Sequence, residues 1–163
     1  MIDGGVRPLA ASDEDSLTAF LETLAGDSDA VRQFHPHPLD RASARRVAAE
    51  SGEDLYFAYF IGELILGYGM LRGWDEGYEV PSLGVAVLPS FRSRGVGTAL
   101  LSFAVKQAAN RGAQEIMLKV EPGNLVARHW YASVGFLETG TADDGQVVCR
   151  RPLLPSAHKQ MGN

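Results

Sequence analysis

The sequence is short of cysteine and of positive charge, and both shortages narrow what the protein can be. Cys149 is the single cysteine, which excludes an internal disulfide framework. The 15 lysine and arginine residues are outnumbered by 20 aspartate and glutamate residues, giving a net charge of −5. This balance argues against a general nucleic-acid binder, because such domains usually carry a basic stripe. A positively charged site, if the chain has one, must be local.

Long apolar runs, a signal peptide and internal repeats are also missing. We therefore expect a cytoplasmic protein with no membrane partner. The chain has 163 residues, of which 45% are hydrophobic, enough for one globular domain with its own core. We predict a single domain over residues 1–154 and a short polar tail at 155–163.

The pattern of apolar residues predicts an α/β protein with the element order β-α-α-β-β-β-α-β-α-β-β. The expected strands are residues 6–9, 55–60, 64–71, 82–88, 115–120, 136–141 and 146–153. The expected helices are residues 11–24, residues 41–51, a long helix that ends near Arg111, and a helix that starts at the cap residue Asn124 and ends near Val134.

A short stretch with two arginines and two glycines, FRSRGVGTALL at residues 91–101, follows the apolar strand at 82–88 and opens the long helix. The N-terminus of a helix offers unpaired N–H groups and a favourable dipole to an anion such as a phosphate group. A nucleotide-triphosphate loop would need a lysine after Gly97, where Thr98 stands, and a dinucleotide fingerprint would need a third glycine. Taken alone, the stretch also fits an ordinary loop with solvated arginines.

A second motif lies further along the chain, in the segment VEPGNLVARHWYASVGF. The two motifs together resemble the GNAT superfamily of acyl-CoA-dependent N-acetyltransferases. The residues that carry the resemblance are Arg92, Gly95 and Gly97 in the first motif and Asn124, Ala127, Tyr131 and Gly135-Phe136 in the second. It covers residues 82–153 by motif and the earlier elements by their order alone. It implies the GNAT fold, a central, mixed, mostly antiparallel sheet of about seven strands flanked by four helices.

The resemblance also implies acetyl-CoA as co-substrate. The pyrophosphate of coenzyme A would be bound by Arg92, Ser93, Arg94, Gly95, Val96, Gly97 and Thr98. Backbone groups of Val85 and Val87 would meet the pantetheine arm, and the N–H of Val87 would face the thioester oxygen. Asn124 and Tyr131 complete the expected cofactor-binding set.

Tyr131 is the expected catalytic acid, because the family's tyrosine protonates the departing thiolate of coenzyme A. The alternative is a core tyrosine that shares a helical face with Ala127 and Val134. Glu79 is the expected general base, since strand alternation would place it on the face of Val85 and Val87. A solvated loop acid or a relay through water stays open as the alternative.

The acceptor amine is expected near Phe34, His35, His37, Trp74 and Glu76. The histidines at 35 and 37 lie between prolines without an evident third ligand, so a metal site is not expected.

The predicted activity is transfer of an acetyl group from acetyl-CoA to a primary amine of a small molecule or peptide, by direct attack in a ternary complex. Cys149 lies far in sequence from the proposed loop, which favours direct transfer over a covalent acetyl-enzyme. Two alternatives stay open: a transferase of a longer acyl chain, and a non-catalytic acyl-CoA-binding sensor or interaction module. The expected binding partners are acetyl-CoA and an amine, and no nucleic acid is expected to bind. The expected oligomeric state is a monomer or a homodimer.

Overall fold

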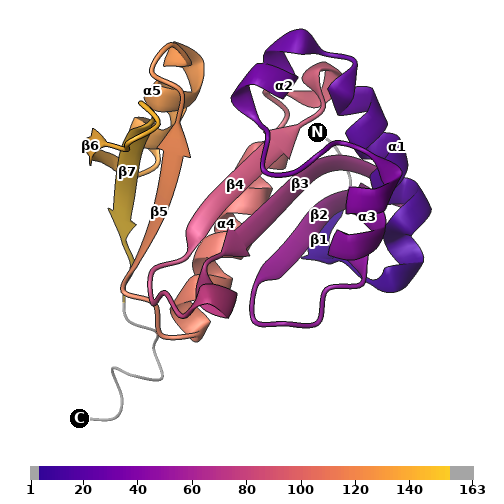
Figure 1. Ribbon diagram of the computed structural model, residues 1–163, viewed down its shortest axis with the longest axis horizontal. Helices are drawn as coiled ribbons and strands as arrows, with labels where there is room; N and C mark the ends of the chain where they lie inside the picture. Colours follow the sequence, from indigo (N-terminus) through magenta and orange to yellow (C-terminus); the bar gives the residue numbers. More distant parts are fainter. Residues whose placement is uncertain (1–3, 155–163) are drawn as a thin grey trace. The chain divides into compact units, whose positions relative to one another are not determined.

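The computed structural model describes residues 4–154 and consists of two compact units (Figure 1). The first unit comprises residues 4–71 and 84–104, and the second comprises residues 72–83 and 105–154. The polar tail expected at 155–163 lies outside the described residues.

The described residues form seven strands, five α-helices and three short 3-10 helices. The strands are β1 (Gly5–Pro8), β2 (Leu55–Ile61), β3 (Leu64–Arg72), β4 (Ser82–Val87), β5 (Glu115–Val120), β6 (Leu137–Thr141) and β7 (Val147–Pro152). The α-helices are α1 (Glu14–Ala25), α2 (Ser28–Gln33), α3 (Arg41–Ala48), α4 (Val96–Asn110) and α5 (Leu125–Ser133). The 3-10 helices are η1 (Ala11–Asp13), η2 (Trp74–Glu76) and η3 (Pro89–Phe91).

The strands belong to one sheet of order β1-β2-β3-β4-β5-β7-β6. The pairs β1–β2, β2–β3, β5–β7 and β6–β7 are antiparallel, whereas β4 and β5 are parallel, with Ser82 opposite Met117. The expected mixed, mostly antiparallel sheet of seven strands is confirmed.

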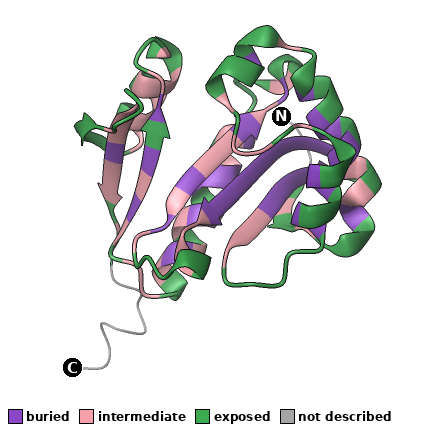
Figure 2. Cartoon of the chain, in the orientation of Figure 1, coloured by how far each residue is buried: buried purple, intermediate pink, exposed green. Residues whose placement is uncertain are grey.

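In the first unit, helices cover both faces of β3. Tyr68 is fully buried and meets Phe20 of α1 edge-on, with ring centroids 6.1 Å apart. Gly67, its neighbour, faces the other way, and a Cβ there would lie 2.7 Å from Val96 and 2.8 Å from Leu100 of α4. Buried residues run along β2 and β3 accordingly (Figure 2). Because Gly67 lets α4 approach closely, the first turn of α4 is fixed against the sheet.

The prediction of four helices missed α2. Asp27 caps this helix, since its Oδ1 accepts a hydrogen bond from the N–H of Ala30 at 2.9 Å. The helix has six residues, of which Ala30 is buried, so it is too short to show an apolar period. The next helix, α3, begins at Arg41 as expected but ends at Ala48.

In the second unit, α5 is joined to β6 by an ion pair between Arg128 and Glu138 at 2.8 Å. Phe136, just before β6, is buried and packs edge-on against Tyr131 of α5, with ring centroids 5.5 Å apart. Among the helices of residues 4–154, none combines the length and apolar character needed to cross a membrane.

Candidate functional site

The first candidate region is the Gly95 loop, residues 92–95, between η3 and α4 in the first unit. The N–H of Leu88 donates to the carbonyl of Leu66 at 3.0 Å and ties the end of β4 to β3. The N–H of Phe91 then donates to the carbonyl of Leu88 at 2.9 Å, closing η3. The four residues that follow are exposed. The segment before the loop is hydrogen-bonded to β3, and the segment after the loop is the first turn of α4. Both ends of the loop are therefore fixed in position.

The backbone of the Gly95 loop explains its glycine. Gly95 has a φ of +89°, and Ser93 has a φ of +61°, which is uncommon for a residue with a side chain. A Cβ at Gly95 would meet nothing within 4 Å, so the glycine is required by the backbone angle rather than by lack of space. The carbonyl of Gly95 accepts the N–H of Ala99 at 3.0 Å and starts α4.

The first turn of α4 presents backbone donors next to this loop. Helix α4 begins at Val96, and its first hydrogen bond of the helical type runs from Ala99 to Gly95, so the N–H groups of Val96, Gly97 and Thr98 have no acceptor four residues earlier within the helix. Arg92 and Arg94 are exposed, and the guanidinium of Arg94 lies 6.0 Å from the centre of the Phe91 ring. These N–H groups, the helix dipole and the two arginines are the kinds of group that favour an anion, and we call them together the anion cradle.

Strand β4 enters this region with Val85 and Val87, both half-buried. Its burial does not alternate strictly, since Leu83 and Ala86 are buried and the two residues between them are half-buried. Glu79 lies in an exposed bend before β4, which begins at Ser82. The expectation that strand alternation places Glu79 on the face of Val85 and Val87 is therefore wrong.

Tyr131 lies on α5 in the second unit and is half-buried. Its ring contacts those of Trp130 and Phe136, at centroid distances of 5.0 and 5.5 Å. Burial raises the pKa of Tyr131 to about 12, with a smaller contribution from the charge that Cys149 would carry as a thiolate. The phenol therefore keeps its proton at neutral pH. The packing also supports the alternative of a structural tyrosine.

Asn124 caps α5, because its Oδ1 accepts a hydrogen bond from the N–H of Ala127 at 3.2 Å. Cys149, on β7, is buried, and burial raises the pKa of its thiol. A buried, protonated thiol is a poor nucleophile.

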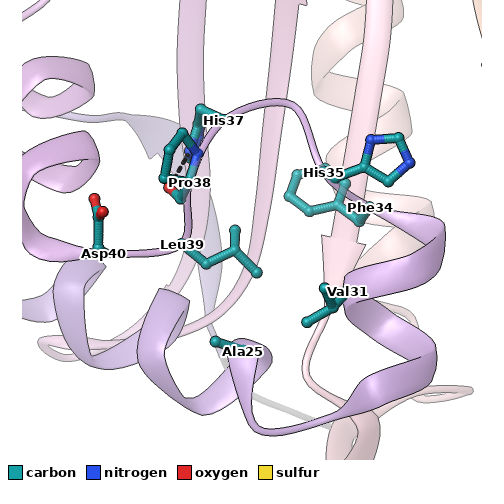
Figure 3. A pocket seen from close by; sticks show the side chains of 8 residues that line it. All are labelled: Ala25, Val31, Phe34, His35, His37, Pro38, Leu39 and Asp40. Carbon is teal, nitrogen blue, oxygen red and sulfur yellow. Dashed lines mark hydrogen bonds between the residues drawn. The ribbon is translucent and has the colours of Figure 1, made fainter.

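A pocket of about 640 Å³ lies in the first unit beside α2 and the FHPHPLD loop, residues 34–40 (Figure 3). Its apolar walls are Ala25, Val31, Phe34, Pro38 and Leu39, and its polar walls are His35, His37 and Asp40. Three of the expected acceptor residues, Phe34, His35 and His37, are thus brought together.

Both ring nitrogens of His37 have partners. Nδ1 lies 2.8 Å from the carbonyl oxygen of Pro38, and Nε2 lies 3.0 Å from the hydroxyl of Tyr68. Nδ1 must donate to the carbonyl, so in the neutral ring Nε2 accepts from Tyr68. Neither nitrogen then offers a free lone pair to a metal ion. Within the described residues no group of three or more His, Cys, Asp or Glu side chains is placed to hold a metal.

The other two expected acceptor residues, Trp74 and Glu76, lie on η2 in the second unit. The guanidinium of Arg111 lies 4.5 Å from the centre of the Trp74 ring, and Glu76 is exposed. The predicted site residues therefore form two sets. The Gly95 loop, the end of β4 and the pocket belong to the first unit, and Asn124, Tyr131, Glu79, Trp74 and Glu76 belong to the second.

Sequence reasoning did not include Tyr68 in the site. Tyr68 is one apolar residue in a buried strand, and it meets His37 across 31 positions of the chain. The two prolines around His37 were the available signal, since they indicate a loop of restricted conformation.

Comparison with known proteins identifies related sequences and structures with the same fold. A model of the acetyltransferase (GNAT) family matches residues 17–136. An aminoglycoside N(6')-acetyltransferase type 1 from Salmonella typhimurium is 33% identical over 69 residues, which are 42% of this chain and 48% of that protein. The chain spans about half the length of the curated relatives it matches.

Two solved structures show the same fold. The GNAT domain of S. lividans PAT matches with a TM-score of 0.79 and 21% identity, covering 91% of this chain and 89% of that one. A GNAT superfamily phosphinothricin acetyltransferase from Sinorhizobium meliloti, solved in complex with AcCoA, matches with a TM-score of 0.75 and 20% identity, covering 96% and 92%.

Proposed function

Because the chain belongs to the GNAT acetyltransferase family, we propose that it transfers an acetyl group from acetyl-CoA to a primary amine. The observation that supports this most directly is the anion cradle at the Gly95 loop, which follows β4 and opens α4. Coenzyme A carries a pyrophosphate, and the N–H groups of residues 96–98 and the two arginines suit it. The relatives whose names state an acceptor differ in it, an aminoglycoside in one case and phosphinothricin in the other.

The remaining cofactor contacts follow from the family's pattern. The backbone of Val85 and Val87 would bind the pantetheine arm as an added strand. The N–H of Val87 would donate to the carbonyl oxygen of the thioester as negative charge develops there. Asn124 and Tyr131 would complete the binding site.

In the proposed reaction the amine nitrogen bonds to the thioester carbon, and the bond from carbon to sulfur then breaks. Tyr131 donates its proton to the departing sulfur, and a base accepts the proton that the amine loses. Glu79 is the proposed base, with Glu76 or a water molecule as alternatives. The thiol of coenzyme A titrates near 8–9, roughly three units below Tyr131, so complete transfer from the phenol would be uphill by about 4 kcal/mol. Proton transfer from Tyr131 to the sulfur is therefore most favourable if the phenol oxygen receives another proton at the same time.

The test is an assay of thiol release from acetyl-CoA with a panel of amines, aminoglycosides, amino acids and peptides. We expect thiol release with at least one amine class, and mass spectrometry should show that the product has gained one acetyl group. Longer acyl-CoA compounds, added as competitors and as donors, test for a longer-chain transferase. Binding of acetyl-CoA in a titration, without turnover on any amine, would contradict acetyl transfer and support the sensor.

A further inference from the structure

The pocket beside α2 is connected to strand β4 through one aromatic ring. A Cβ at Gly84 would lie 3.7 Å from Cε1 of Phe34, so the Phe34 ring lies against β4 at this position. Gly84 directly precedes Val85, the first of the two residues proposed to meet the pantetheine arm. Phe34 also forms a wall of the pocket. A ligand in the pocket would therefore lie beside the strand proposed to hold the acyl donor.

We infer that this pocket receives an apolar group, aliphatic or aromatic, of the amine acceptor, and so selects apolar primary amines over polycationic ones. The inference rests on the proposed acetyl transfer and goes beyond it by naming the class of acceptor.

The chemistry of the walls supports an apolar group. Five of the eight lining residues are apolar, and Val31 and Leu39 lie on opposite sides of the space, one on α2 and one on the loop (Figure 3). Asp40 is the one carboxylate among the lining residues, and its Oδ1 already accepts the N–H of Ser43 at 2.9 Å. A polycation would lose its hydration here without finding enough opposite charge.

The loop that forms this pocket is held in place before any ligand arrives. His37 binds the carbonyl of Pro38 and the hydroxyl of Tyr68, which is fully buried on β3. Phe34 meets the same Tyr68 edge-on, with ring centroids 6.0 Å apart. A pocket formed in advance loses less conformational entropy on binding. Its volume also lies within the range usual for small-molecule sites.

The first experiment measures kcat/KM at saturating acetyl-CoA for ethylamine, n-butylamine, n-hexylamine, 2-phenylethylamine and spermidine. Each methylene that enters the pocket should raise kcat/KM by about fourfold until the space is filled. We expect n-hexylamine and 2-phenylethylamine to exceed ethylamine by tenfold or more, and spermidine to fall below both. Equal values along the alkyl series, or a preference for spermidine, would overturn the inference.

The second experiment places a charge in the wall of the pocket with Val31→Asp and compares it with Leu64→Asp. Both positions are exposed apolar residues of the first unit, 39% and 55% exposed, and Leu64 lies at the start of β3, away from the pocket. Val31→Asp should lower kcat/KM for n-hexylamine about tenfold, with a much smaller change for ethylamine and for the KM of acetyl-CoA. Equal losses in the two variants would contradict the inference.

If no amine is acetylated, the acetyl-transfer proposal fails. A calorimetric titration with 2-phenylethylamine then tests, independently of catalysis, whether the pocket binds apolar amines. Binding that Val31→Asp weakens about tenfold and Leu64→Asp leaves unchanged supports the pocket's ligand class. No binding, or equal weakening in both variants, overturns it.

Discussion

The hydroxyl of Tyr68 lies 3.0 Å from Nε2 of His37 and ties the FHPHPLD loop to the buried face of β3. Through this contact a fully buried residue helps to hold a loop that lines the pocket. Tyr68 also packs against Phe34 and Phe20, so its ring and its hydroxyl have separate roles. The ring fills the core, and the hydroxyl orients His37.

Tyr68→Phe removes the hydroxyl and keeps the ring. We expect the free energy of unfolding to fall by about 1 kcal/mol, the value of one hydrogen bond. The KM for the amine should rise severalfold, with the KM for acetyl-CoA unchanged, because the loop loses its tether while the Gly95 loop keeps its contacts. Steady-state kinetics with each substrate varied in turn will show this difference.

A double-mutant cycle with His37→Ala checks the cause. If the hydroxyl acts through His37, the double variant should be no worse than the worse single variant. Additive losses would show that Tyr68 acts through its packing instead.

Gly95→Ala tests the anion cradle, and Gly145→Ala is its matched control. The two glycines have φ values of +89° and +88°, and a Cβ at either would meet nothing within 4 Å. Both substitutions should therefore cost the same stability, about 1 kcal/mol, for an unfavourable backbone angle. We expect Gly95→Ala alone to weaken binding of acetyl-CoA, by about tenfold in a calorimetric titration. Equal affinity in the two variants would remove the Gly95 loop from the cofactor site.

Much of the sheet was predictable because its signals are local. Strand β5 has the predicted bounds, and the ends of β2 and β3 differ from the prediction by one residue at most, since apolar runs and a glycine turn mark them.

Features that depend on tertiary contacts were not predictable. The contact between His37 and Tyr68 joins residues 31 positions apart, and neither segment contains a sequence signal that predicts the contact. Glu79 was misplaced because a bend, not a strand, precedes Ser82. The split of the chain into two units, with β4 passing from one to the other, also has no local signal.

Tyr131→Phe tests the proposed acid. The substitution keeps the ring and its contacts with Trp130 and Phe136, so the free energy of unfolding should change little. We expect kcat to fall about a hundredfold, within the range of general acid catalysis, and the KM for acetyl-CoA to stay nearly constant. Tyr78→Phe is the control, because Tyr78 is 64% exposed in the same unit.

The pH profile gives a second check on Tyr131. With a pKa of about 12, the phenol is protonated throughout the usual assay range, so Tyr131 should add no alkaline limb to the rate of the wild-type protein. An alkaline limb near pH 9 that disappears in Tyr131→Phe would contradict this assignment of the pKa.

Cys149→Ala separates direct transfer from a covalent acetyl-enzyme. Cys149 is buried and its thiol pKa is raised, so the reactive thiolate is scarce at neutral pH. We expect turnover to remain nearly unchanged, with a loss of about 1 kcal/mol in stability from the small cavity. Loss of all turnover in a variant that still unfolds cooperatively would instead support a covalent intermediate.

Asp13 and Arg7 should make the first unit sensitive to acid. Asp13 is buried, and its carboxylate accepts two hydrogen bonds from Arg7, at 2.8 and 2.9 Å, and one from the N–H of Ala10 at 2.8 Å. The hydrogen bond from Arg7, above all, lowers the pKa of Asp13. Since the folded pKa lies below the unfolded value, this stabilisation is present above pH 4 or so and is lost as the pH falls through the folded pKa.

Asp13→Asn should therefore lower the free energy of unfolding by about 2 kcal/mol at pH 7 and by much less near pH 2. Urea unfolding at a series of pH values measures the difference. Asp15→Asn is the matched control, because Asp15 pairs with Arg41 at 2.9 Å while its side chain is 90% exposed. An exposed pair contributes below about 1 kcal/mol, so Asp15→Asn should lower the free energy of unfolding at pH 7 by less than Asp13→Asn does. The same pH dependence in both variants would mean that the buried pair of Asp13 and Arg7 does not govern the acid stability of the fold.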